Sequence, residues 1–127
     1  MSKITVLVLD VLNGKGLYEA EIEQDNIHDI YPLLGCDCFD IAYRKIGGKC
    51  YDIFCDDEGL FKDSPVTSAI YKSTMGLALV GNLMFANHDL EGNTTGLSKE
   101  DIDVIKKNVV GLYDFDSGKS WNAIFIE

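Results

Sequence analysis

The stretch FDIAYRKIGGKCYDIFCDDEGLF, residues 39–61, decides the fold that we expect for this chain. Two runs rich in β-branched and aromatic residues, 39–46 and 50–55, flank a pair of glycines, which is typical of a β-hairpin. A two-residue loop would mix charged and apolar side chains on both faces, so we expect a three-residue loop at 47–49. That register places six side chains on one apolar face: Phe39, Ile41, Tyr43, Tyr51, Ile53 and Cys55.

The N-terminal segment also has the pattern of a hairpin. Residues 3–12, KITVLVLDVL, are rich in Val, Ile and Leu, which is typical of a buried strand. Asn13 and Gly14 follow as a strong hairpin signal, and residues 17–23 then alternate between apolar and acidic side chains. We expect a second, half-exposed strand that turns one face to the core. That face carries Tyr18, Ala20 and Ile22.

A short helix is expected after this hairpin. Asp25 or Asn26 can cap it, and the apolar residues that follow recur at helical spacing up to Gly35, where the helix would end. Pro32 limits its length, because proline has no amide hydrogen to donate. This helix would cover the sheet that the strands form.

The middle of the chain predicts one helical turn and one or two strands. Ser64 is followed by a proline, which predicts a capped helical turn that reaches about Tyr71. Residues 76–87, GLALVGNLMFAN, are the most apolar stretch. They predict either one central strand with a bulge at Gly81, or two short strands that turn at Gly81 and Asn82.

The clearest helix signal lies at residues 97–111. Ser98 is in a cap position with Asp101 three residues later, and apolar residues follow at helical spacing. Gly111 would end the helix. Two lysines lie near its C-terminal end, where cations complement the helix dipole: Lys106 and Lys107.

Together these segments predict a single α+β domain over residues 1–127. It would have a mainly antiparallel sheet of hairpins, a short helix after the second strand and a capped helix near the C-terminus. Hydrophobic residues make up 46% of the chain, which is enough for a real core. The tail at 121–126, which begins with Trp121 and ends with Ile126, predicts either a last strand or an arm through which copies of the chain associate.

The chain is strongly acidic, with a net charge of −10 at pH 7 from 21 acidic and 11 basic residues. Such a surface repels phosphate, so direct nucleic-acid binding is not expected. No apolar run approaches the ~20 residues of a membrane-spanning helix, and residues 1–10 lack the long apolar region of a signal peptide. We therefore expect a cytoplasmic protein whose four cysteines are reduced thiols.

The four cysteines could supply a zinc site by number alone. Their spacing, C-x-C and then C-x4-C, differs from the paired C-x2-C of zinc knuckles, and Cys50 and Cys55 would point to opposite faces of their strand. A C-x-x-C redox motif is absent from the sequence. We therefore expect no metal site and no cofactor from these thiols: Cys36, Cys38, Cys50 and Cys55.

Other chemical motifs are incomplete. The acidic run at 56–58 ends in a glycine, which is typical of a turn, and it lacks the alternate ligand spacing of a calcium loop. Residues 116–120, DSGKS, lack the first glycine of a phosphate-binding loop. His88 and Asp89 are an adjacent histidine–aspartate pair without an evident nucleophile. No catalytic residue is predicted, and a small hydrolase that uses His88 and Asp89 stays an alternative.

The order of these features resembles the DUF3846 family, small proteins of unknown function that are frequent in phages, plasmids and mobile elements. The resemblance covers residues 3–90. It is carried by the first hairpin and short helix, by CDDEGLF at 55–61, by Pro65 and by the apolar segment that begins at Gly76. Members often carry Asn-Arg-Ala after that proline, where this chain has TSA at 67–69, so an anion site on that arginine is not expected here.

The resemblance implies a small α+β protein that acts by binding. Small phage proteins of this kind often block host defence, which suggests two routes. One sequesters a small nucleotide signal among aromatic and basic side chains, with these candidates: Tyr43, Arg44, Tyr71 and Lys72. The other docks an acidic face on a host defence protein, with these candidates: Asp56, Asp57, Glu58 and Asp63. An oligomeric structural protein is a further alternative.

Overall fold

The computed structural model of the chain describes residues 2–24, 26–59, 62 and 65–127. Within these ranges, no helix is long and apolar enough to cross a membrane. The helices described within these ranges are a 3-10 helix, η1 (Ile27–Asp29), and two α-helices, α1 (Ile30–Leu34) and α2 (Lys99–Lys107). The strands are β1 (Lys3–Asp10), β2 (Gly16–Glu23), β3 (Phe39–Ile46), β4 (Lys49–Asp56), β5 (Thr67–Tyr71), β6 (Leu77–Val80), β7 (Leu83–His88), β8 (Thr94–Thr95), β9 (Val109–Asp114) and β10 (Lys119–Ile126).

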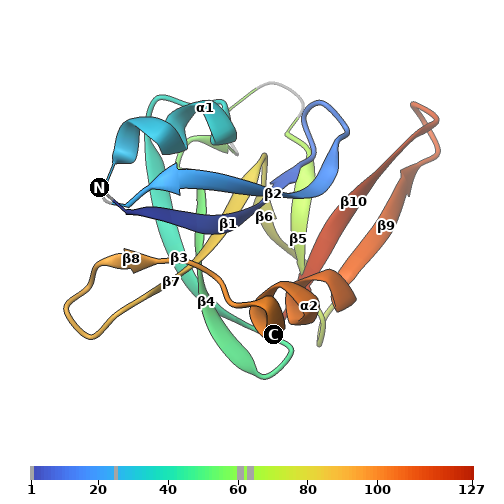
Figure 1. Cartoon of the computed structure of the whole chain (residues 1–127). Coiled ribbons are helices and arrows are strands. Elements are labelled where there is room, and N and C mark those ends of the chain that lie inside the picture. The colour runs from blue at the N-terminus through green and yellow to red at the C-terminus, as the bar shows by residue number, and fades with distance from the viewer. Residues whose placement is uncertain (1, 25, 60–61, 63–64) are drawn as a thin grey trace.

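The strands form two sheets, and the β9–β10 hairpin projects from one side of the molecule (Figure 1). Sheet A has the strand order β2-β1-β7-β4-β3, with β8 paired to the end of β7. Sheet B has the order β6-β5-β10-β9, in which the β5–β10 pair is parallel. The α+β class expected from the sequence is therefore correct, although one sheet is mixed rather than antiparallel.

The middle of sheet A is buried on both of its faces. One face packs against sheet B and α2 in a cluster that includes Ile53, Ile105 and Ile124. The other face packs against α1 in a second cluster that includes Phe54 and Leu34. Because successive side chains of a strand point to opposite faces, Ile53 and Phe54 lie in different cores, which explains why β4 is apolar on both faces.

The β3–β4 hairpin differs from the expected register by one residue. Ile46 is opposite Lys49, so the loop consists of Gly47 and Gly48 alone, and the predicted three-residue loop was wrong. Both glycines have positive φ angles, 59° and 94°, as the tight two-residue hairpin turns require. Lys49 therefore belongs to β4.

The physical reason for this error lies in the packing of the two strands. A hairpin must carry its apolar side chains on one face, and its charged side chains on the other, only when just one of its faces is buried. Here β4 is buried on both faces, while β3 is the edge strand of sheet A, with Ile41 50% exposed and Tyr43 54% exposed. Mixed faces are therefore tolerated in both strands.

The predicted helical turn up to Tyr71 was also wrong, because the chain forms β5 there. Its cap, Ser64, lies outside the described residues. Ala69 and Ile70 are buried, and β5 pairs with β10 on one side and β6 on the other. The two flanking strands form hydrogen bonds with the backbone N–H and C=O groups of this segment when it is extended. This stabilisation outweighs the local signal of serine and proline for a helix start.

The apolar segment 76–87 forms two strands, as one of the two predictions stated, but they belong to different sheets. Gly81 has a φ of 80°, and Asn82 next to it is buried. The Asn82 side chain accepts hydrogen bonds from the backbone N–H groups of Val11 (2.9 Å) and Leu12 (3.1 Å), and its amide donates to the carbonyl of Leu33. This corner thus connects β1, β7 and α1.

Helix α2 begins as predicted but ends earlier. Ser98 and Asp101 form the reciprocal capping box. Asn108 follows the last helical residue, so the predicted end at Gly111 was wrong: Gly111 lies within β9. The β-branched pair before it favours a strand, and β9 pairs with β10. Of the two structures predicted for the tail segment 121–126, the chain forms the strand: the segment belongs to β10, which lies between β5 and β9.

The Asp101 carboxylate connects α2 to sheet A. It accepts hydrogen bonds from Lys49 Nζ (2.6 Å), Tyr51 Oη (3.0 Å), Asn87 Nδ2 (2.9 Å) and the backbone N–H of Ser98 (3.0 Å). Burial alone would raise the pKa of Asp101, but the hydrogen bonds from Lys49, Ser98 and Asn87 outweigh it and hold that pKa well below its usual range. The carboxylate is therefore ionised in the folded protein at neutral pH.

Replacement of Asp101 by asparagine is expected to lower the free energy of unfolding at pH 7 by about 2 kcal/mol, because donors to a buried charge lose their acceptor. The pKa is lower in the folded than in the unfolded state. The contribution of the carboxylate is therefore present above the unfolded pKa and is lost as the pH falls below it. The difference between wild type and Asp101→Asn should shrink as the pH falls from about 5 toward 2, as measured by urea unfolding.

A matched control is Asp103→Asn, which removes an exposed carboxylate from the same helix and should change stability little at any pH. An Asp101→Asn protein as stable as the wild type at pH 7 would contradict the assigned role of the carboxylate.

Candidate functional site

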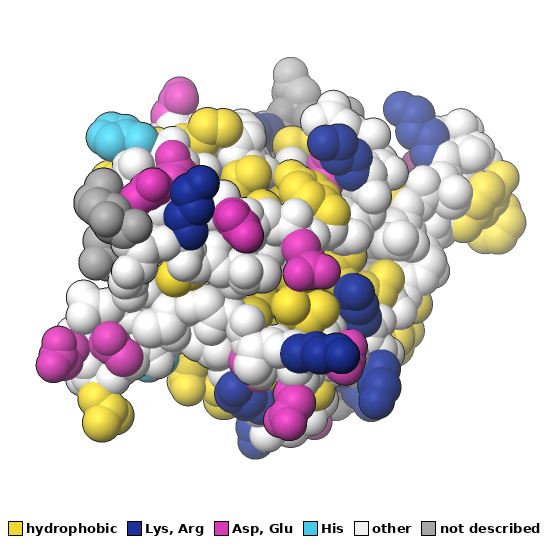
Figure 2. Space-filling view, viewed as in Figure 1, with side chains coloured by type: hydrophobic (Ala, Val, Ile, Leu, Met, Phe, Trp, Pro, Cys, Tyr) yellow, Lys and Arg dark blue, Asp and Glu magenta, His cyan; other side chains and the backbone are white. Residues whose placement is uncertain are grey.

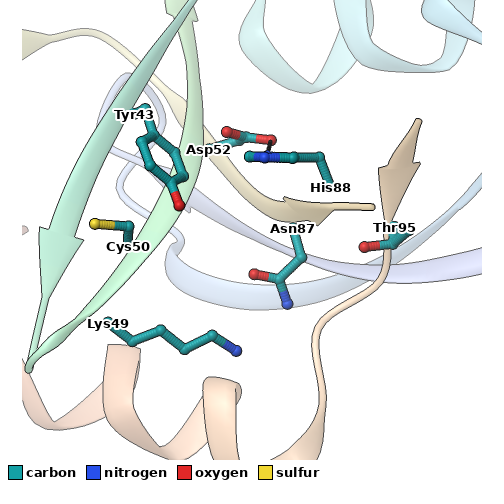
Figure 3. A pocket seen from close by; sticks show the side chains of 7 residues that line it. All are labelled: Tyr43, Lys49, Cys50, Asp52, Asn87, His88 and Thr95. Carbon is teal, nitrogen blue, oxygen red and sulfur yellow. Dashed lines mark hydrogen bonds and ion pairs between the residues drawn. The ribbon is translucent and has the colours of Figure 1, made fainter. Parts of the chain in front are cut away.

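A cavity of about 330 Å³, which we call the His88 cavity, lies at the end of sheet A that α1 does not cover. It lies between β3, β4, β7 and β8 (Figure 3). Its lining residues are Tyr43, Lys49, Cys50, Asp52, Asn87, His88 and Thr95.

The alternation of strand residues explains why four of these side chains meet on one face of the sheet: Tyr43, Cys50, Asp52 and His88. Cys50 and Asp52 are two residues apart on β4, so they point to the same face. Tyr43 is directly opposite Asp52 in the β3–β4 ladder, and His88 ends β7, the neighbour of β4 on its other side. Three adjacent strands thus bring together residues that are distant in the sequence.

The central contact of the cavity is an ion pair or hydrogen bond between His88 and Asp52. His88 Nδ1 lies 2.8 Å from Asp52 Oδ2. An ionised carboxylate can only accept, so Nδ1 carries the proton and donates it. The Asp52 side chain is 12% exposed and that of His88 is 41% exposed. The carboxylate therefore fixes the ring orientation, and with the proton on Nδ1 the Nε2 atom can accept a hydrogen bond from a ligand.

Tyr43 forms an aromatic rim beside this pair. Its ring centroid lies 5.4 Å from that of His88, with the two planes tilted at 55°. Partial desolvation, together with the nearby Cys50 and Asp52, raises the pKa of Tyr43, so its hydroxyl remains a hydrogen-bond donor at neutral pH. An exposed aromatic face at the mouth of a cavity can stack against a planar ring.

The opposite wall carries polar side chains, two of which donate hydrogen bonds to the Asp101 carboxylate. In Figure 3, Lys49 and Asn87 lie on the far side of the cavity from Tyr43, and Thr95 lies beside Asn87. Lys49 bonds to Asp101, yet its side chain is still 55% exposed, so the ammonium group can donate further hydrogen bonds into the cavity. The packing of α2 thus positions the one ammonium group of the cavity.

The structure brings only one of the four candidate ligand residues into this cavity, namely Tyr43. Arg44 is the next residue on β3, so it points to the opposite face, and its guanidinium donates to the backbone carbonyl of Tyr43 at 3.0 Å. Tyr71 ends β5 in sheet B, and Lys72 follows it, with its backbone N–H bonded to Ile126. The four side chains therefore do not converge.

The candidate partner-binding acids form a turn rather than an isolated acidic face. Asp56 is paired with Lys62 at 2.6 Å and also accepts a hydrogen bond from the backbone N–H of Glu58. Asp57 is exposed beside them, and Asp63 lies outside the described residues. Figure 2 shows acidic and basic side chains interspersed on the face that it presents.

The expected partner of His88, Asp89, instead stabilises a turn. Its carboxylate accepts hydrogen bonds from the backbone N–H groups of Glu91 and Asn93, and these bonds lower its pKa. The carboxylate that contacts His88 is Asp52, which the sequence analysis did not single out. The sequence contains one signal that could have indicated this residue: strand alternation places Asp52 on the same face of its strand as Cys50.

The cysteines occupy separate places in the fold. All four are free thiols; Cys38 is exposed and Cys55 is buried. Burial raises the pKa of the Cys55 thiol to about 11. Among the described residues, no group of three or more His, Cys, Asp and Glu side chains could hold a metal ion.

A family model described as "Domain of unknown function (DUF3846)" matches residues 4–110 of the chain. The match includes every residue that lines the His88 cavity. It confirms the resemblance drawn from the sequence and extends it from residue 90 to residue 110. No curated protein and no solved structure matches the chain.

Replacement of Asp52 by alanine is expected to change the tautomer of His88, because the carboxylate is what holds the proton on Nδ1. Nitrogen-15 chemical shifts of the ring should show an Nδ1–H imidazole in the neutral wild-type protein and a mixture of tautomers in Asp52→Ala. The control variant is Asp89→Asn, which removes the charge adjacent to His88 in sequence and should leave the ring shifts unchanged. A tautomer shift in the control alone would assign the partner role to Asp89.

Proposed function

We propose that this chain, which belongs to the DUF3846 family of unknown function, is a non-catalytic binding protein that sequesters a small nucleotide in the His88 cavity. The observation that supports this proposal best is the combination, in one cavity, of an exposed aromatic ring on one wall and hydrogen-bond donors on the other. A nucleotide presents the same two chemistries, a planar base and an oxygen-rich sugar phosphate.

The base would lie against the rim that Tyr43 and His88 form. Stacking on an aromatic ring tolerates any base, and the Nε2 atom of His88 would add a hydrogen bond to a base N–H. The phosphate would lie toward Lys49, which has unused N–H groups, with the Thr95 hydroxyl beside it. A volume of about 330 Å³ is at the lower end of ordinary ligand pockets, which suits a small nucleotide.

The charge of the protein limits the kind of nucleotide. A net charge of −10 produces a long-range field that opposes polyanions, and the cavity itself contains Asp52. A cyclic nucleotide carries one negative charge per phosphate, whereas a nucleoside triphosphate carries several. The electrostatics therefore favour cyclic nucleotides over triphosphates.

The biological setting in this proposal is that of a phage or mobile-element protein in the host cytoplasm, where removal of a nucleotide signal would oppose host defence. This setting rests on the family resemblance. The alternative route, in which the acidic turn docks on a host defence protein, has weaker support because Asp56 already pairs with Lys62.

Replacement of Tyr43 by alanine is expected to weaken nucleotide binding about tenfold or more, because base stacking contributes roughly 1–3 kcal/mol per base. Isothermal titration calorimetry with a panel of cyclic mononucleotides and cyclic dinucleotides would measure the change. The matched control is Tyr113→Ala on β9, since the exposed fractions of the two tyrosines are 54% and 55%. Equal affinities of Tyr43→Ala and the wild type, or no binding by the wild type, would contradict the proposal.

A small hydrolase remains the second candidate, and the 2.8 Å contact between His88 and Asp52 is the observation that favours it. A histidine oriented by a carboxylate can act as a general base through Nε2. This version differs from the sequence hypothesis, because Asp52 takes the place of Asp89.

The two candidates differ in what happens to the bound nucleotide. For a binding protein, the nucleotide should be recovered intact after prolonged incubation with the wild-type chain, as measured by liquid chromatography. Product formation that disappears in His88→Ala, and that persists in the control variant His28→Ala, would establish the hydrolase instead.

A further inference from the structure

Among the described residues, no strand pairs with the outer edge of β3. In an antiparallel ladder, pairs that exchange backbone hydrogen bonds alternate with pairs that do not. The two-residue loop makes Ile46 and Lys49 the last bonded pair, so Tyr43 and Ile41 belong to the pairs that do not exchange bonds with β4. Their N–H and C=O groups therefore point to the free edge of sheet A.

Two contacts agree with this assignment. The carbonyl of Lys45, which belongs to the same alternating set, accepts a hydrogen bond from the backbone N–H of Glu127 on the outer side of β3. The carbonyl of Tyr43 accepts one from the Arg44 guanidinium, so this side chain lies along the edge. In the part of the chain that the structure describes, the stretch from Asp40 to Arg44 therefore has no neighbouring strand, and only the Arg44 side chain contacts its edge.

We propose that two copies of the chain pair through this edge, with β3 antiparallel to β3 of the second copy and the two-fold axis at Ala42. In this register Ile41 is opposite Tyr43 of the partner subunit, and both residues have outward-pointing backbone groups. Four backbone hydrogen bonds form, two on each side of the axis, and the β3–β4 ladder does not change. The Arg44 guanidinium leaves the Tyr43 carbonyl, which it contacts in the single chain, and turns to the partner subunit.

The side chains are complementary in the same register. Asp40 is opposite Arg44 of the partner subunit, and by symmetry Arg44 is opposite Asp40 of the partner subunit, so two opposite-charge pairs form on one face. On the other face, Ile41 meets Tyr43 of the partner subunit twice. This pairing covers two exposed apolar residues, whose exposed fractions are 50% and 54%.

The opposite edge of sheet A has no such complementarity. Strand β2 carries Glu19, Glu21 and Glu23 on one face, so two copies of β2 would place like charges opposite or close to each other. An acidic edge of this kind discourages pairing between copies. The contrast between β2 and β3 supports a second copy of the chain as the occupant of the β3 edge.

The pairing would also complete the His88 cavity. Tyr43 forms the rim of the cavity on β3, and Ile41 of the partner subunit would lie beside it. The two cavities of the dimer would then lie on one continuous sheet face, on either side of the two-fold axis.

Sedimentation velocity of the wild-type protein over a wide concentration range is expected to show a monomer–dimer equilibrium. Asp40→Arg and Arg44→Asp each place like charges opposite each other twice, so each should weaken the dimer about tenfold or more. The double variant Asp40→Arg/Arg44→Asp restores both pairs and should restore the dimer. A wild-type monomer at every concentration, or a double variant that remains monomeric although its thermal unfolding matches the wild type, would overturn the proposal.

Two further variants test the register and the backbone contribution. Lys45→Asp makes the same charge change as Arg44→Asp on the same strand, but this residue does not face Asp40 of the partner subunit, so the dimer should persist. Ile41→Pro removes only an outward N–H and should abolish the dimer while the monomer stays folded. If Ile41→Pro is unfolded, Ile41→Asp replaces it in the test. Loss of the dimer in Lys45→Asp but not in Arg44→Asp would contradict the register.

Discussion

The short length of α1 sets how much of sheet A is exposed. The central strands of sheet A are apolar on both faces and need cover on both. Sheet B and α2 cover one face, whereas the other is covered by a helix of only five residues. Beyond that helix the strands continue with polar side chains, which is where Asp52 and His88 meet. The candidate site thus exists because α1 is too short to cover the whole of this face of sheet A.

The Asp101 carboxylate connects the stability of the fold to the chemistry of this site. Its partners Lys49 and Asn87 also form the polar wall of the His88 cavity. A buried charge that accepts several hydrogen bonds holds its donors in place, because loss of any of them leaves the charge poorly solvated. The position of Lys49 in the cavity therefore depends on the capping residue of a distant helix.

Local signals predicted the elements that depend on neighbours in the chain. The first hairpin, the capping box of Ser98 and Asp101 and the helix that ends at Gly35 were all expected from short motifs. The predictions were wrong where pairing with a segment distant in the sequence determines the local structure. The segment ending at Tyr71 is a strand because β10 and β6 flank it, and Gly111 continues a strand because β9 pairs with β10. The partner of His88 was missed for the same reason.

The sequence by itself determined the class of the fold and the capping box of α2, because these follow from periodicity and from hydrogen bonds between residues a few positions apart. Its motifs also carried the resemblance to the family that the family model confirms. It also indicated Tyr43 as a candidate, since an aromatic residue in an amphipathic strand is visible without a structure. Only the tertiary structure decided which carboxylate faces His88, which residues share a cavity and which strand lies at an open edge. These properties depend on strand order and register, which are set by the simultaneous burial of both faces of sheet A and not by any local stretch of the chain.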